Sequence, residues 1–385
     1  MSNILTLNKI SKIGLSKFTS EYKISDTMEN PDAILLRSFN MHEYEMPKSL
    51  LAIGRAGAGV NNIPVDKCAK DGIVVFNTPG ANANAVKELV LAGLFLASRD
   101  VVGGIKWASE LNSDTIAKDV EKGKGAFVGP ELLGKKLGVV GLGAIGVMVA
   151  NAAHHLGMEV IGYDPFMSVE AAWSVSKSIK RAVDLKEIYE NCDYITLHLP
   201  YNKDTASMIN TQTIAQMKDG VRILNFARAE LVDPAAMKSA LDEDKVAKYV
   251  CDFPNNDINV YKNVVAIPHL GASTPEAEDN CAVMAVNEIM DFLENGNIIN
   301  SVNYPRVSLP RSTETRITVA HENKPNMLSQ ISNQVAKEGL NIENMLSGSK
   351  NDVAYTILDV NGDVNEAVKN DMEAIEGVIR VRIIK

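Results

Sequence analysis

Two residues in the second half of the chain have side chains suited to carboxylate binding and proton transfer. Arg228 follows the apolar run Leu224–Phe226, and a planar guanidinium there could hold both oxygens of a carboxylate. His269 follows the apolar run Val264–Ile267, and an imidazole titrating near neutrality could give a proton to a carbonyl oxygen during hydride reduction. A surface salt bridge for Arg228 and a structural role for His269 are the alternatives. Their joint placement at one sheet edge favours the catalytic interpretation.

Polar residues follow two other expected strands of the same region. His198 closes the stretch Tyr194–Leu199, where it either lines a cofactor or packs within the strand. Asp252 and Asp257 follow the strand expected to begin at Lys248. Ligands of open parallel sheets bind beyond the carboxyl ends of the strands, so these residues are further site candidates.

The stretch from Leu137 to Asp164 is the element around which these residues are expected to gather. It reads as a strand, the turn Gly141-x-Gly143-x-x-Gly146, a helix and a second strand ending on an acid. This order is typical of dinucleotide binding, with the phosphates at the helix N-terminus. Asp164 would accept hydrogen bonds from a ribose 2′-hydroxyl and repel a 2′-phosphate, which favours NAD over NADP. A purely structural turn is the alternative.

Regular alternation of strands and helices surrounds this element and predicts a doubly wound parallel sheet. Further strands are expected at 194–199, 221–226, 248–252 and 264–267, and helices at 85–98, 184–190, 211–217, 234–241 and 275–295. The first part, up to about Asn84, has a separate alternation of strands and helices. Strands are expected there at 33–36, 50–53 and 73–76 and a short helix at 64–70. A polar stretch, Lys122–Gly129, is expected to be a connection.

The last 70 residues have a different pattern. Residues 301–315, with two prolines, resemble a linker. Beyond them, strands are expected at 316–320, 342–347, 353–360 and 378–384, and helices at 327–338 and 364–376. This βαββαβ order predicts a small ferredoxin-like module.

Composition excludes several classes of function. A chain of 385 residues should form two or three domains, and a net charge of −9 disfavours nucleic acid or an anionic membrane as the main partner. The four cysteines are scattered without metal-ligand spacing, which predicts reduced thiols and no metal site. We expect no signal peptide and no membrane span, and therefore a cytoplasmic protein.

The chain resembles the D-isomer-specific 2-hydroxyacid dehydrogenases, most closely the members that act on 3-phosphoglycerate. The matching stretches are Arg55–Ile63, Asn82–Leu89, Glu131–Gly138 leading into the glycine turn, Asn225–Asp233 and Pro268–Thr274. The resemblance implies a discontinuous flavodoxin-like substrate domain (residues 1–84 and 270–304), a Rossmann NAD-binding domain (85–269), a linker (305–315) and a C-terminal ACT domain (316–385).

By this resemblance Arg228 binds the substrate carboxylate and carbonyl, and His269 is the acid/base. The glutamate that normally pairs with the histidine is missing. Counting from Arg228 puts Asp257 in its place, whereas aligning on Phe253-Pro254 puts Asn256 there. We predict Asp257, because only a carboxylate can stabilise an imidazolium. The residues expected to contact NAD are Gly141, Gly143, Ala144, Ile145, Gly146, Tyr163, Asp164, Pro165, His198, Leu199, Pro200, Thr205, Phe226, Ala227, Arg228, Asp252, His269, Gly271 and Ala272.

A phosphorylated substrate carries more negative charge than one arginine can balance. The residues expected to bind it, besides Arg228 and His269, are Arg37, Ser38, Arg55, Ala56, Gly57, Asn82 and Lys87. Lys87 replaces a small residue of the family and is either an extra phosphate ligand or a solvated helix residue.

The C-terminal module resembles ACT domains, which bind amino acids at subunit interfaces. By that resemblance His321, Asn323 and Asn341 would bind L-serine. Asn326 stands where the family has glycine, and asparagine is the next most tolerant residue for a positive φ. A module that only mediates dimerisation is the alternative.

The sequence therefore predicts an NAD-dependent oxidation of 3-phosphoglycerate to 3-phosphohydroxypyruvate, inhibited by L-serine. Another 2-hydroxy acid (glyoxylate or 2-hydroxyglutarate) is the first alternative, and an NAD-sensing binding protein without catalysis is the second. ACT pairing and the apolar helix after Ala85 favour a symmetric assembly of two or four chains.

Overall fold

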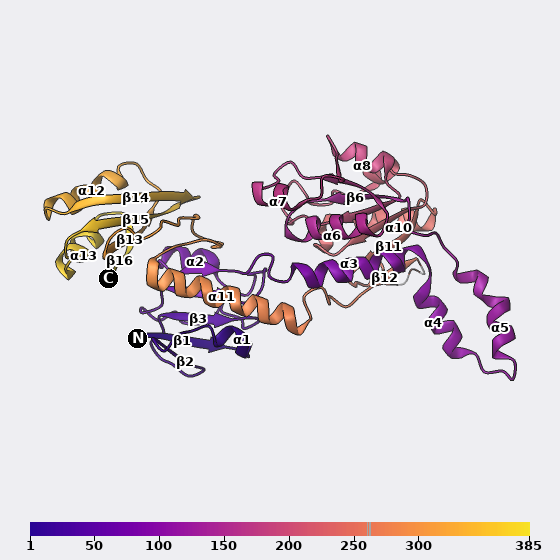
Figure 1. Ribbon diagram of the computed structural model, residues 1–385, viewed down its shortest axis with the longest axis horizontal. Coiled ribbons are helices and arrows are strands. Elements are labelled where there is room, and N and C mark those ends of the chain that lie inside the picture. Colours follow the sequence, from indigo (N-terminus) through magenta and orange to yellow (C-terminus); the bar gives the residue numbers. More distant parts are fainter. Residues whose placement is uncertain (260, 262) are drawn as a thin grey trace. The chain divides into compact units, whose positions relative to one another are not determined.

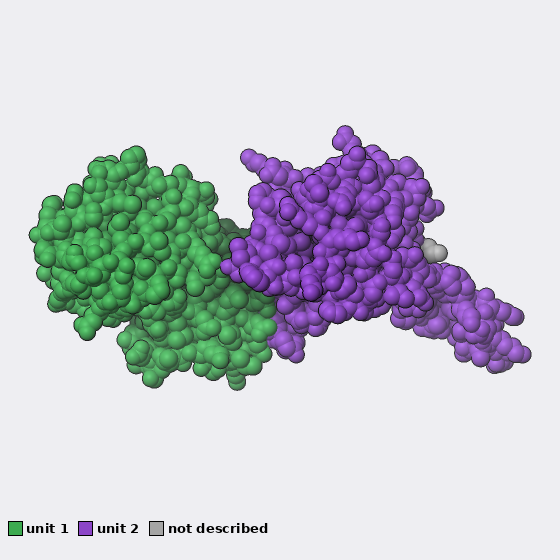
Figure 2. All heavy atoms as spheres, turned by 45° about the horizontal axis from the view of Figure 1, so that its top comes forward, with its two compact units in different colours: residues 1–81, 278–385 green, residues 82–277 purple. Residues whose placement is uncertain are grey.

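The computed structural model describes residues 1–259, 261 and 263–385, and two compact units divide the chain. The first unit contains Met1–Ala81 and Glu278–Lys385, and the second contains Asn82–Ala277 (Figure 2). The chain thus crosses between the units at 81/82 and at 277/278, near the boundaries expected at 84/85 and 269/270.

The second unit is built on a seven-stranded sheet, and all its pairs are parallel. Its strands are β6 (Lys136–Val140), β7 (Glu159–Tyr163), β8 (Lys180–Arg181), β9 (Tyr194–Leu197), β10 (Val221–Asn225), β11 (Val246–Cys251) and β12 (Val264–Ala266). The order β12-β11-β10-β9-β6-β7-β8 places the glycine-turn strand β6 at the point where the order reverses. This is the doubly wound topology, and the expected Rossmann fold is confirmed.

The second unit also contains helices, most of which lie against this sheet (Figure 1). They are α3 (Ala83–Ser98), α4 (Val101–Glu110), α5 (Ile116–Gly123), α6 (Ala144–His155), α7 (Val169–Ser174), α8 (Leu185–Asn191), α9 (Thr211–Ala215) and α10 (Pro234–Asp242), with short 3₁₀ turns η1 (Lys124–Phe127) and η2 (Ala229–Leu231). The polar stretch expected as a connection, Lys122–Gly129, instead contains the end of α5 and η1. Trp107 and Phe127 pack against each other there, with ring centroids 5.3 Å apart, and a Cβ on Gly123 would lie 2.3 Å from the Trp107 ring.

The first unit has a five-stranded parallel sheet in the order β2-β1-β3-β4-β5. The strands are β1 (Ser2–Leu7), β2 (Tyr22–Ser25), β3 (Ala33–Leu36), β4 (Ala52–Arg55) and β5 (Val74–Phe76), with helices α1 (Lys12–Leu15) and α2 (Val65–Lys70). The order is flavodoxin-like, as expected. The strand expected at 50–53 begins instead at Ala52 and includes Arg55.

Helix α11 (Pro275–Asn295) has the bounds that the sequence predicts. Proline suits the first turn of a helix, and Gly296, with φ +70, follows the last helical residue. Its residues Ala285, Val286, Ile289 and Phe292 belong to the buried core of the first unit.

The C-terminal module is a four-stranded antiparallel sheet in the order β14-β15-β13-β16. Its strands are β13 (Thr315–Glu322), β14 (Asn341–Lys350), β15 (Val353–Asn361) and β16 (Val378–Ile384), and its helices are α12 (Met327–Lys337) and α13 (Glu366–Glu373). The expected βαββαβ order is confirmed. Asn326 has φ +69, so the asparagine does occupy the left-handed conformation for which glycine is usual.

This module docks onto the end of α11 through arginine side chains that bind main-chain carbonyls. Arg316 donates from Nη1 to Asn295 O (2.8 Å), and Arg382 donates to Phe292 O (3.0 Å) and Leu293 O (2.8 Å). The last four carbonyls of a helix have no partner within the helix, so these bonds cap α11. Tyr355 Oη donates to Gly296 O (2.8 Å) in the same place.

Arg316 is fully buried and is held by a bidentate pair with Asp359. Nε lies 2.6 Å from Oδ1 and Nη2 lies 3.0 Å from Oδ2. Burial opposes ionisation of Asp359, but the bonds from Arg316 and Ser312 lower the pKa of this carboxyl below its usual value. The pair is thus held in its charged form within the docked module.

Candidate active site

The glycine turn after β6 has the geometry that its sequence predicts. Gly141 has φ +93, and a side chain there would meet His198 O at 2.6 Å. A Cβ on Gly146 would lie 1.9 Å from Gly141 O, whereas a Cβ on Gly143 would meet no atom within 4 Å. Gly141 and Gly146 are therefore required by the fold, and Gly143 keeps open the space that a ligand would enter. The N-terminus of α6, at Ala144 and Ile145, faces the same turn.

Asp164 lies just beyond β7 and organises the neighbouring backbone. Oδ2 accepts from Leu142 N (2.9 Å) and Oδ1 accepts from Phe166 N (2.8 Å). A cavity of about 410 Å³ opens beside it, and its lining is mostly apolar: Leu142, Gly162, Asp164, Pro165, Met167, Val175, Ile179, Lys180 and Arg181. An apolar cleft with an acid at its edge fits the adenosine half of NAD. Lys180 and Arg181 were not predicted to line it, because β8 has only two residues and no pattern.

His198 is a neutral side chain that packs against the turn. Its Nε2 lies 3.0 Å from Thr196 Oγ1, and burial lowers its pKa to about 3. It is therefore unable to serve as an acid near neutral pH. Its main chain lies against the glycine turn, and its contact with a cofactor stays a prediction.

The other residues expected to contact NAD lie at the same edge of the sheet. Tyr163 is the last residue of β7, and Leu199 and Pro200 follow β9. Thr205 donates from Oγ1 to Pro200 O (2.8 Å), which shapes this loop. Phe226 is buried beneath α3, where a Cβ on Gly93 would lie 3.0 Å from its ring.

Arg228 is exposed at the carboxyl end of β10, and a buried asparagine holds its main chain in place. Asn225, with no exposed surface, donates from Nδ2 to Arg228 O (2.9 Å) and accepts from Ala227 N (3.2 Å). The side chain of Arg228 donates to Ala227 O (2.6 Å). Among the described residues no carboxylate forms a salt bridge with Arg228, so the surface salt bridge considered as its alternative is not formed.

Asp252 is the carboxylate that lies between Arg228 and His269. It is 2% exposed and follows β11, the strand between β10 and β12. Burial raises the pKa of Asp252, and the charges of His269 and Arg228 oppose that shift. Its Oδ1 has no hydrogen-bond partner in the described part of the chain, so one buried acceptor is available to a ligand or to the histidine.

His269 is exposed and has φ +41, an unusual backbone conformation for a side chain of this size. Its ring meets the edge of Phe253, with centroids 5.2 Å apart. Gly271 is buried against Asp252, whose Oδ2 would lie 3.4 Å from a Cβ, and Ala272 follows it. Backbone and aromatic contacts thus fix the loop that carries the histidine.

Asp257 lies in an exposed turn closed by Asn255, whose Oδ1 accepts from Asp257 N (3.0 Å). Within the described residues neither Asp257 nor Asn256 is hydrogen-bonded or ion-paired to His269. The pairing of Asp257 with the histidine stays a prediction, and Asp252 is the acid whose pKa is lowered by the charge of His269.

The first unit holds five of the residues expected to bind substrate. The backbone of Arg37 and Ser38 is ordered by Asn8, whose Oδ1 accepts from both N–H groups (3.3 and 3.0 Å). The side chain of Arg37 pairs with Glu278 at 2.5 Å. Asn8 and Glu278 were not predicted, because their partners lie far away in the sequence.

Arg55 ends β4, and its Nε donates to Arg37 O (3.1 Å). Gly57 has φ +152, and a Cβ there would come within 2.2 Å of Arg55 Nη1. The glycine therefore makes room for the guanidinium, and Ala56 is buried beside it. This arrangement places Arg37 and Arg55 next to each other.

Asn82 and Lys87 belong to the second unit, together with Arg228 and His269. Asn82 is the N-cap residue of α3 but makes no side-chain capping bond. Lys87 is 20% exposed and lies 3.7 Å from Glu88, a weak contact that leaves its two expected roles open. The expected substrate residues are thus divided between the two units.

The three residues expected to bind an effector differ in accessibility. His321 is 3% exposed, and its ring nitrogens lie 2.8 Å from Glu322 O and 2.9 Å from Thr356 Oγ1. Asn323 and Asn341 are exposed and bond to Asn351 O (3.0 Å) and Glu343 Oε1 (2.7 Å). Solvent can reach the two amides, whereas both ring nitrogens of His321 already have hydrogen-bond partners.

The parallel sheet, the glycine turn and the acid after β7 define an NAD-binding dehydrogenase domain. Residues 99–271 match the NAD-binding domain of the D-isomer-specific 2-hydroxyacid dehydrogenases, and residues 317–380 match an ACT domain like that of acetohydroxyacid synthase (AHAS) small subunits. The chain belongs to the D-isomer-specific 2-hydroxyacid dehydrogenase family.

Proteins named D-3-phosphoglycerate dehydrogenase are among its relatives. The one from Haemophilus influenzae is 31% identical over 88% of this chain and 82% of its own length. The one from Synechocystis is 34% identical over 78% of this chain, and the match spans 53% of that protein. A solved structure of NAD-bound 3-phosphoglycerate dehydrogenase from Entamoeba histolytica has a TM-score of 0.60 at 25% identity, covering 78% of this chain and 98% of that one. In the described residues, no helix has the length and apolar character needed to cross a membrane.

Proposed function

We propose that the protein oxidises D-3-phosphoglycerate to 3-phosphohydroxypyruvate with NAD, the first step of phosphorylated L-serine synthesis. The observation that carries this proposal is the alignment with the Haemophilus influenzae enzyme of that name over most of both chains. The arrangement of Arg228, Asp252 and His269 on three adjacent strands supports it.

The residues fit an NAD molecule by their own chemistry. Gly143 leaves open space, the first N–H groups of α6 face it, and Asp164 borders the apolar cleft. When bound, NAD supplies the acceptor for the hydride that leaves C2 of the substrate.

The protein's part in the reaction is to hold the substrate and to move one proton. Arg228 binds the carboxylate through its planar guanidinium, and His269 takes the proton from the C2 hydroxyl. Asp252 stabilises the imidazolium that forms, because it is a buried carboxylate within reach of its charge. Arg37 and Arg55 are the cations that the proposal assigns to the phosphate.

The regulatory part of the proposal concerns the C-terminal module. L-serine would bind at the exposed amides of Asn323 and Asn341, with the ring of His321 as part of the supporting wall. Exposed apolar residues on α4 and α5, among them Val102 and Ile105, support assembly into a dimer or tetramer. The apolar side of α3, which suggested such an assembly in the sequence, is instead buried within the second unit. We place the protein in the cytoplasm.

The first experiment measures the loss of NADH absorbance with 3-phosphohydroxypyruvate, with and without millimolar L-serine. Fast oxidation that serine suppresses supports both parts of the proposal. Oxidation that is indifferent to serine retains the enzyme and removes the regulatory part. No oxidation despite NADH binding indicates another 2-hydroxy acid or an NAD-sensing protein.

Two variants separate these alternatives. Arg37→Ala should cripple turnover of the phosphorylated substrate and spare glyoxylate if the phosphate assignment is right. His269→Ala should abolish turnover and leave NADH binding within about twofold. Full biological activity of His269→Ala would instead favour the sensor.

A further inference from the structure

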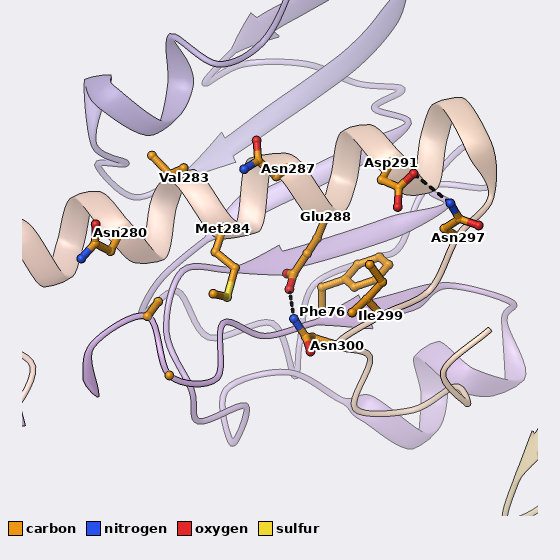
Figure 3. Close-up of a pocket in the computed structure, with 12 residues that line it drawn as sticks. Phe76, Asn280, Val283, Met284, Asn287, Glu288, Asp291, Asn297, Ile299 and Asn300 are labelled. Carbon is orange, nitrogen blue, oxygen red and sulfur yellow. Dashed lines mark hydrogen bonds between the residues drawn. The ribbon is translucent and has the colours of Figure 1, made fainter. Parts of the chain in front are cut away.

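A second cavity, of about 630 Å³, lies wholly within the first unit and contains none of the residues assigned above (Figure 3). One side is α11, and the other is formed by the end of β5 with the loops at 80–81 and 297–300. The lining residues are Phe76, Gly80, Ala81, Asn280, Val283, Met284, Asn287, Glu288, Asp291, Asn297, Ile299 and Asn300.

Glu288 is the buried polar group of this cavity. It is 9% exposed, and its side chain extends from α11 toward the loops in Figure 3. Asn300 Nδ2 donates to Oε1 (2.6 Å), but Oε2 is buried and has no hydrogen-bond partner in the described part of the chain. A buried acceptor of this kind costs free energy unless something occupies the space before it.

The titratable side chains that line the cavity are all acidic. Glu288 and Asp291 are its only titratable lining residues, and no lysine, arginine or histidine is among those that the structure describes. Asp291 is already engaged, because Oδ1 accepts from Asn295 (2.9 Å) and Asn297 (3.0 Å). An anion would find no countercharge here, whereas a cation would find a carboxylate.

Burial raises the pKa of Glu288 to about 8, and only the bond from Asn300 opposes the shift. In the empty cavity the carboxyl therefore holds a proton near neutral pH. A cation placed against Oε2 would supply the countercharge that ionisation lacks.

The remaining lining indicates the size and polarity of the ligand. Phe76, Val283, Met284 and Ile299 form an apolar wall, and Asn280 and Asn287 are exposed at the rim. A bare metal ion needs several oxygen ligands, and the described residues contain no group of three metal-binding side chains. The cavity suits a short aliphatic chain that ends in a single positive group.

We propose that this cavity is a binding site for a small primary alkylammonium ion, whose ammonium group pairs with Glu288 and whose chain packs on the apolar wall.

Calorimetric titration of the full-length protein with propylammonium tests the site, with propionamide as the neutral ligand of matched size. Binding should release close to one proton at about pH 7, because Glu288 must ionise, and the release is read from titrations in buffers of different ionisation enthalpy. The affinity should rise about tenfold between about pH 7 and pH 9, as the ionised fraction of a group with a pKa of about 8 grows. Propionamide should bind at least tenfold more weakly.

Glu288→Gln keeps the shape and an acceptor for Asn300 but removes the charge, so it should lose at least tenfold in affinity and all of the proton release. Asp291→Asn is the matched control on the same helix and should change the affinity less than about threefold. A melting temperature at or above that of the unaltered protein shows that Glu288→Gln is folded. The proposal is wrong if millimolar propylammonium does not bind, if propionamide binds equally well, or if Glu288→Gln binds propylammonium as the unaltered protein does.

Discussion

At the scale of the residue, Asp252 is the side chain on which the chemistry of His269 depends. Its carboxyl is buried, lies near Arg228 and His269, and keeps one oxygen without a partner among the described residues. A carboxylate so placed can fix the orientation of the imidazole and balance its charge when it takes a proton.

We expect Asp252→Asn to lower kcat about a hundredfold with little change in the Kd for NADH. The direction in which activity changes with pH follows from the pKa of Asp252. Burial raises the pKa of Asp252, and the ionised form is the active one, so activity should fall as the pH drops through this raised pKa. That acidic limb should be absent from the residual activity of Asp252→Asn. An unchanged limb would assign the role to another carboxyl, with Asp257→Asn as the next variant to measure.

Two glycines of the turn make a matched pair that separates folding from cofactor binding. Gly143→Ala meets no protein atom, so the variant should keep its melting temperature but bind NADH at least tenfold more weakly. Gly146→Ala would press a Cβ to 1.9 Å from Gly141 O and should lose stability as well as binding. Fluorescence titration and thermal unfolding measure the two quantities, and equal behaviour of the two variants would contradict this reading of the turn.

The sequence predicts these local features well because each depends on near neighbours. The glycine turn, Asp164 and the whole of α11 follow from spacing, a helix-starting proline and a terminal glycine. Local spacing does not reveal which partners the charged side chains bind. Asn8 binds backbone about 30 residues away, and Arg316 finds Asp359 at a separation of 43, so only the folded chain reveals them.

At the scale of the element, α11 depends on the C-terminal module for its last turn. Arg382 binds two of its carbonyls and stacks on Phe292, with the guanidinium carbon 4.5 Å from the ring centroid. Without this side chain Leu293 O would lose this donor, whereas Phe292 O would still accept from Gly296 N (2.9 Å).

We expect Arg382→Met to lower the free energy of unfolding by about 3 kcal/mol, because the packing volume is kept and two hydrogen bonds are lost. Lys385→Met is the control, since its pair with Asp363 is exposed and should contribute less than about 0.5 kcal/mol. Chemical denaturation of both variants gives the comparison. Equal losses would mean that the capping bonds contribute no more than a surface pair.

The helices α4 and α5 show where sequence patterns fail at this scale. They project from the second unit in Figure 1, and none of their residues is buried. The glycines within these helices suggest a loop, and this composition hid the helices in the sequence. Strands β1 and β2 were missed as well, although β1, with six residues, is longer than the predicted strands of the same sheet.

At the scale of the whole molecule, the C-terminal module shares one core with the rest of the first unit. Ala320, Tyr355 and Ile357 of the module belong to the same buried cluster as Phe292 and Tyr304. The sequence predicts separate domains joined by a linker. It does not reveal that these domains pack against each other, because the apolar residues on each would look the same in the sequence if the domains were apart.

We therefore expect removal of residues 312–385 to cost stability, not only regulation. The shortened chain would expose the cluster around Phe292, and its melting temperature should fall by about 10 °C or more, with aggregation on size-exclusion chromatography. A monodisperse shortened protein of unchanged melting temperature would show instead that the module is a separable appendage.

The docking of this module through main-chain carbonyls also affects which mutations the interface can tolerate. The acceptors at Phe292, Leu293 and Asn295 exist whatever side chains those positions carry, so α11 can drift in sequence without losing its partners. The donors, Arg316 and Arg382, have no such freedom. Natural variation at this junction should therefore be tolerated better at Leu293 and Asn295 than at the two arginines, whereas Phe292 is fixed by its place in the core.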